Sequence, residues 1–150
     1  MLSPKLIHLI EAHEDVIVRN VLRAIRHDPT LTQLSRLPDQ ELRERGQEIM
    51  KNLSHWLTQG HEQSLAHEYE AVGRERFEAG VPLHEAVRAL CIIRNKMIEF
   101  VDEQGMDRDS VQLYAEEQFE RRLTRFFDDL MVHLVRGYET AWRHAAHLAA

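Results

Sequence analysis

Ten histidines in 150 residues make metal or haem binding the first chemistry to consider, because neutral imidazole is a common ligand for both. Their spacing does not support a helical zinc motif. His61 and His67 are six residues apart, whereas that motif places two histidines four apart on one helix face. His144 and His147 share a helix face, but we expect only adventitious metal binding there.

Three further histidines lie on or beside predicted apolar stripes. His13 is close to the centre of the stripe on the first predicted helix, and His55 and His133 lie at the edges of later stripes. The structural interpretation, a histidine bonded to a carbonyl or lying at the rim of the core, is favoured for each. His13 and His55 remain the candidate ligand-binding histidines.

Arg94 lies within an unusually wide apolar arc on the predicted helix of residues 83–101. A guanidinium there needs a carboxylate, several carbonyls or a ligand, because an unpaired buried charge is very costly. An ion pair with Asp128 or Asp129 is the favoured explanation. The alternatives are an anionic ligand, such as a fatty acid or a haem propionate, and a role in fixing register across a dimer interface.

Catalytic motifs are missing from the sequence. It contains no glycine-rich phosphate loop, no G-x-S-x-G turn and no paired-cysteine metal motif. The single cysteine, Cys91, lies on a mostly apolar face, where an inert thiol is the expected state. The sequence therefore predicts a non-enzymatic protein, and one cysteine fits a reducing compartment.

Composition predicts one globular domain spanning residues 1–150, with 43% hydrophobic and 29% charged residues. The net charge of −6 argues against nucleic-acid binding, which needs a concentrated basic surface. No apolar run is long enough to span a membrane, and no signal peptide is recognisable at the N-terminus. We expect a cytoplasmic protein with no nucleic-acid or membrane partner.

Helical periodicity dominates the chain and predicts an all-α fold of about five long helices. These helices are expected at about 4–27, 39–60, 62–79, 83–104 and from about 110 onward, with one short turn within 28–38. The last helix, at 35 or more residues, would be about 50 Å long, whereas a compact domain of this size is about 35–40 Å across. It is therefore expected to project beyond the core.

The wide apolar arc of the fourth helix and the length of the fifth both favour a homodimer. In that arrangement the two helices of each copy form a four-helix bundle with those of the other. The alternative is a monomer in which the fourth helix is simply central. The expected interface residues are Leu83, Val87, Leu90, Ile93, Met97, Phe119, Phe126, Leu130 and Leu134.

Three segments resemble a known sensor family. They are WLTQG at 56–60, YEAVGRERFEAGVPLHEAVRAL at 69–90 and YAEEQFERRLTRFFDDLMVHLVRGYE at 114–139. They are similar to the N-terminal sensory domain of RsbR/RsbRD-type proteins, the RsbT co-antagonists of the bacterial stress response, and the likeness covers nearly the whole chain. The resemblance implies a globin-like, dimeric fold that lacks haem in its best-known members, with a final helix leading to an output domain.

This sequence ends at Ala150 without such an output domain, so we expect either a stand-alone sensor or part of a longer one, acting on a protein partner in stress signalling. A haem-binding gas or redox sensor is the alternative. The helix that would supply a proximal ligand, 62–79, contains only His67, which is predicted to point to solvent. We therefore expect no cofactor, and His13 or His55 would be the best ligands if haem bound.

Overall fold

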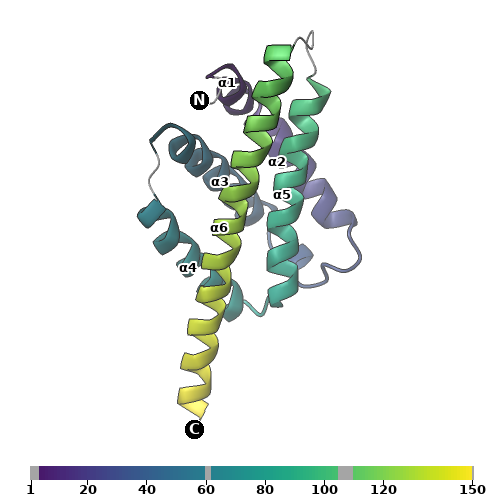
Figure 1. Cartoon of the computed structure of the whole chain (residues 1–150). Coiled ribbons are helices and arrows are strands. Elements are labelled where there is room, and N and C mark those ends of the chain that lie inside the picture. The colour runs from purple at the N-terminus through teal and green to yellow at the C-terminus, as the bar shows by residue number, and fades with distance from the viewer. Residues whose placement is uncertain (1–3, 60–61, 105–109, 150) are drawn as a thin grey trace.

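The structure is a computed structural model that describes residues 4–59, 62–104 and 110–149 (Figure 1). Within these ranges every regular element is a helix, as predicted. The elements are α1 (Pro4–Ala12), α2 (Glu14–His27), the 3-10 turn η1 (Leu34–Arg36), α3 (Asp39–Gln59), α4 (Glu62–Glu78), α5 (Leu83–Glu103) and α6 (Ser110–Ala149).

The first predicted helix is divided at His13, which corrects the single helix expected over 4–27. The His13 backbone adopts φ −120° and ψ 23°, so it ends α1 and begins α2. Its Nδ1 atom lies 2.9 Å from the carbonyl oxygen of Leu9, one turn earlier. The sequence has neither glycine nor proline at this position, so the usual signals of a helix end were missing.

The connection from α2 to α3 contains the predicted short turn, η1. Helix α3 then begins after Pro38, whose carbonyl accepts a hydrogen bond from the Leu42 N–H at 3.2 Å. Asp39 and Glu41 lie in the first turn, where negative charge is favourable at the positive end of the helix dipole. The predicted positions Gly60 and His61 lie outside the described residues.

The turn between α4 and α5 follows from the sequence Gly80-Val81-Pro82. Gly80 has a positive φ of 78°, the left-handed conformation that glycine adopts without a steric penalty. The Gly80 N–H bonds the Phe77 carbonyl and the Val81 N–H bonds the Arg76 carbonyl, both at 3.0 Å, which is the Schellman pattern. The predicted helix boundary at Gly80 is confirmed, and Pro82 precedes the first residue of α5.

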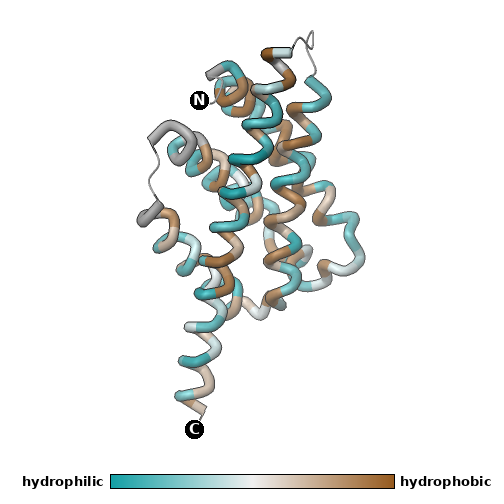
Figure 2. Tube along the Cα trace, in the orientation of Figure 1, coloured by the Kyte–Doolittle hydropathy of each residue, from teal (hydrophilic) through white to brown (hydrophobic). Residues whose placement is uncertain are grey.

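Helix α6 contains 40 residues and is therefore about 60 Å long. Figure 1 shows that α4 and α6 run in the same direction, that α5 runs in the opposite direction beside α6, and that α6 extends beyond the ends of both. The predicted projection of the last helix is confirmed. Figure 2 shows that apolar residues are concentrated where helices meet, whereas the projecting part of α6 is mixed.

The core is continuous through all the helices. Its largest fully buried side chains come from the middle of α6, including Phe119, Phe126 and Phe127. The rings of Phe126 and Phe127 meet edge to face, with centroids 5.4 Å apart and an interplanar angle of 88°. Helix α6 is thus the central element against which α4 and α5 pack.

Candidate functional site

Two buried polar side chains fix the start of α5. The Glu85 side chain is only 1% exposed, and its Oε1 atom accepts hydrogen bonds from the backbone N–H groups of Gln33 and Leu34 at 2.9 and 3.1 Å. The Tyr138 hydroxyl donates to the Val81 carbonyl at 2.9 Å, and burial raises the pKa of Tyr138 to about 12. The start of α5 is therefore tied to η1 on one side and to α6 on the other.

Two glycines allow α4 and α6 to touch backbone to backbone. A Cβ atom added at Gly137 would lie 2.2 Å from the Glu70 carbonyl oxygen and 2.9 Å from the Cα atom of Gly73. A Cβ atom at Gly73 would lie 2.3 Å from the Leu134 carbonyl oxygen. Such distances leave no room for any side chain, so α4 and α6 are held together more closely than ordinary packed helices.

Ion pairs also join α3 to α4. Arg76 is buried and donates from Nη1 to Oε1 of Glu41 at 3.1 Å. Desolvation lowers the pKa of Arg76, and the nearby Glu41 carboxylate opposes that shift. Arg45 of α3 pairs with both Glu48 and Glu75. This network attaches α3 to the α4–α6 pair.

An apolar strip runs along the outer side of α5 and α6, and we name it the α5–α6 edge. Leu83 of α5 and Trp142 of α6 line one groove of about 430 Å³, which places the outer sides of the two helices next to each other. Leu83, Val132 and Trp142 are 39%, 51% and 63% exposed, and the other members are half-buried. The edge consists of Leu83, Val87, Cys91 and Ile98 on α5 and Met131, Val132, Val135 and Trp142 on α6.

Most of the expected dimer-interface residues are buried within one chain, which corrects that assignment. Only Leu83 is exposed and Val87 half-buried. The other seven pack in the core of a single copy, because α1, α2 and α6 cover the apolar arc of α5, and α4 and α5 both pack against α6. These seven are Leu90, Ile93, Met97, Phe119, Phe126, Leu130 and Leu134. They need no second copy to bury them.

Arg94 is half-buried rather than central to the buried face of α5, which corrects its expected position. Its Nε atom donates to Asn95 Oδ1 at 3.5 Å. The expected partners Asp128 and Asp129 are exposed, and no ion pair joins either to Arg94 among the described residues. The guanidinium reaches water from the side of the helix, so no buried charge has to be compensated.

The candidate histidines differ in their exposure. His13 is half-buried, with its Nδ1 atom at Leu9 and its ring 5.3 Å from the ring of Phe100. His55 is exposed on α3. The two therefore do not share the buried apolar cavity that a haem requires. His67 is exposed, as predicted.

His133, the second histidine predicted at the edge of a stripe, is half-buried on α6. Its Nδ1 atom is buried and has no hydrogen-bond partner among the described residues. Over the same ranges, no group of three or more His, Cys, Asp or Glu side chains is arranged to hold a metal ion.

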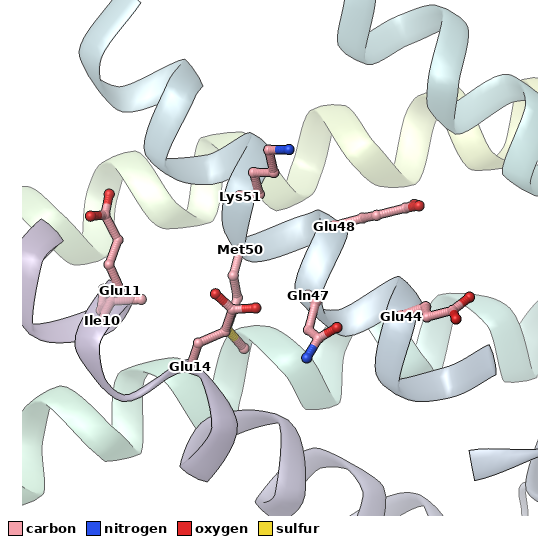
Figure 3. Close-up of a pocket in the computed structure, with 8 residues that line it drawn as sticks. All are labelled: Ile10, Glu11, Glu14, Glu44, Gln47, Glu48, Met50 and Lys51. Carbon is pink, nitrogen blue, oxygen red and sulfur yellow. The ribbon is translucent and has the colours of Figure 1, made fainter. Parts of the chain in front are cut away.

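An acidic groove of about 380 Å³ lies where α1 and α2 meet α3 (Figure 3). Glu11 and Glu14 approach it from one side, and Glu44 and Glu48 from α3. Partial burial raises the pKa of Glu14, and the charges of Asp15 and Glu11 add to that effect. Figure 3 shows that the four carboxylates point in different directions and do not converge on one point.

The structure adds two buried carboxylates and two glycines that the sequence analysis did not identify. Glu85 and Glu116 are buried carboxylates within helices, and Gly73 and Gly137 form the closest helix contact. Helical periodicity could have identified Glu116, because it lies one turn before Phe119 on the buried face of α6. The acceptor role of Glu85 depends on η1, about fifty residues earlier, and no local pattern predicts it.

A comparison with known protein families tests the resemblance carried by the segments 56–60, 69–90 and 114–139. A family model described as the RsbT co-antagonist protein rsbRD N-terminal domain matches residues 14–150. The chain belongs to this family. Searches among curated proteins and among solved structures each find no match.

Membership of the rsbRD N-terminal domain family makes the chain a member of a signalling family rather than of a known enzyme family. The matched range begins at the first residue of α2 and therefore leaves out α1. None of the described helices combines the length and the apolar character needed to cross a membrane.

Proposed function

We propose that this chain is a non-enzymatic sensor domain with a globin-like arrangement of helices, which pairs with a second copy through the α5–α6 edge. The carrying observation is the exposed apolar character of this edge. Large apolar side chains gathered on one side of two adjacent helices are typical of a protein interface. A two-fold axis along the edge would place α5 and α6 of both copies in a four-helix bundle.

The output is proposed to pass through α6 to a protein partner or an output domain in stress signalling. Family membership supports a signalling role. The course of α6 supports the route, because this helix crosses the core, borders the α5–α6 edge and then projects beyond it (Figure 1). A signal that changes how two copies pack would change the position of α6, provided that the signal favours one of two states.

The test is the oligomeric state measured by light scattering over a dilution series. We expect the wild-type chain to form dimers, and Leu83→Glu or Val132→Glu to raise the dimer dissociation constant by about tenfold or more, since each buries a charge in an apolar contact. Both positions are exposed in one chain, so the fold should survive.

The matched control is Val16→Glu on α2. Val16 has an exposure of 37%, close to the 39% of Leu83, but it lies on a different helix. This variant should dimerise like the wild type. A wild-type monomer at every concentration, or equal weakening by all three substitutions, would refute pairing through the α5–α6 edge.

A further inference from the structure

A small cavity lies at the end of the molecule where α1 meets the last turn of α5 and the early part of α6. Its volume is about 220 Å³. An apolar cavity of about 150 Å³ is large enough to bind benzene, so this one has room for a single ring with a short substituent. Three walls are apolar, Leu6, Leu9 and Val101, and the polar lining residues are Lys5, His8, Gln104 and Glu116.

Glu116 is the unusual member of this lining. Its side chain is only 8% exposed, yet its carboxylate has no hydrogen-bond or ion-pair partner among the described residues. Its carboxylate oxygens are not fully enclosed, so a charged ligand in the cavity can reach them. Lys5 and His8 line the same cavity, but both are exposed and neither forms an ion pair with Glu116.

Several carboxylates lie near Glu116, in addition to Lys5 in the cavity lining. Partial burial raises the pKa of Glu120, and the charges of Asp102, Glu116 and Glu117 raise it further. These carboxylates come from the end of α5 and the early part of α6. A positively charged group entering the cavity would relieve this repulsion and supply the partner that Glu116 lacks.

We propose that this cavity binds a small organic amine, with its ammonium group at the Glu116 carboxylate and its apolar part against Leu6, Leu9 and Val101. Helix α1 supplies most of the lining and lies outside the residues that the family model matches. In the proposed sensor such an amine would be the input. The binding itself does not depend on dimerisation, so the two proposals can fail separately.

Three probes that share a phenyl ring test this site by titration calorimetry on the full chain. They are 2-phenylethylamine, 2-phenylethanol and 3-phenylpropionate, which carry a positive, a neutral and a negative end. The amine should bind most tightly. Glu116→Gln should weaken binding of the amine by about tenfold or more, because the charge-assisted contact becomes a weaker hydrogen bond to a neutral oxygen, and should leave binding of the alcohol unchanged.

Glu117→Gln is the matched control, since it removes the same charge from the adjacent, exposed position and should change amine binding much less. Leu9→Phe should weaken the amine and the alcohol alike by filling the cavity, with circular dichroism confirming that the helices are retained. No amine binding, tighter binding of the propionate, or equal effects of Glu116→Gln and Glu117→Gln would each overturn the proposal.

Discussion

Replacing Gly137 by alanine should separate α4 from α6. The added Cβ atom would lie 2.2 Å from the Glu70 carbonyl oxygen, whereas ordinary contact is about 3.4 Å, so the backbones must part by about 1 Å. No side chain can rotate away, because the opposing atoms are backbone. Overpacking then costs about 3 kcal/mol. The better helix propensity of alanine offsets about 1 kcal/mol of this cost, so the free energy of unfolding should decrease by about 2 kcal/mol.

The assay is thermal or urea unfolding followed by circular dichroism. For a chain of this size the loss corresponds to a decrease in Tm of about 4–8 °C. Gly46→Ala is the control: its Cβ would meet only the two Val18 methyl groups, at 3.4 and 3.7 Å, so helix propensity alone should stabilise it by about 1 kcal/mol. If Gly137→Ala is as stable as the wild type, the close backbone contact between α4 and α6 is wrong.

Two further predictions concern the start of α5. Glu85→Ala should lower the free energy of unfolding by about 3 kcal/mol, because it leaves the N–H groups of half-buried Gln33 and buried Leu34 without their acceptor. Glu85→Gln, which keeps an oxygen, should lower it less in the same urea titration. The pKa of Tyr138 is raised from about 10 in the unfolded chain to about 12, so the contribution of Tyr138 to stability should be fully present below pH 10 and be lost as the pH rises to 12. Tyr138→Phe should lower the free energy of unfolding by about 1 kcal/mol at neutral pH. Between pH 10 and 12 the stability of this variant should fall less than that of the wild type, and an equal fall would show that Tyr138 is not its cause.

The start of α5 and the length of α6 follow from features visible in the sequence. Gly80 and Pro82 mark the start of α5 because glycine tolerates the left-handed conformation and proline cannot continue a helix. The apolar stripe of α6 is unbroken from Phe119 to Tyr138, so its length was predictable. In these cases the signal is local, and local signals are the ones a sequence carries directly.

The errors have a different origin. The apolar arc of α5 correctly indicated a helix with more than one neighbour, but periodicity cannot distinguish neighbours in the same chain from those in a second copy. Leu90 and Met97 are therefore core residues rather than interface residues. Arg94 was expected to need a partner because a helical projection gives a direction and not a depth. The role of Gly137 depends on Gly73, which lies on another helix, so no local pattern predicts it.

The acidic and cavity-lining residues could be predicted only in part. Glu116 lies in register with Phe119, so its burial is readable from the period of the helix. The cavity is not readable, because it requires α1, the end of α5 and α6 to meet. Likewise, the break at His13 separates α1 from α2 without any residue that normally ends a helix.

The contact between Gly73 and Gly137 fixes the point about which α6 can tilt against α4. With α4 attached to it at this point, the helix is held firmly about twelve residues before its last described residue. That length of helix is about 18 Å, so a tilt of about 10° around the glycines would move its tip by about 3 Å. A small tilt of α6 against α5 would thus be transmitted to the tip of α6, without either helix having to bend.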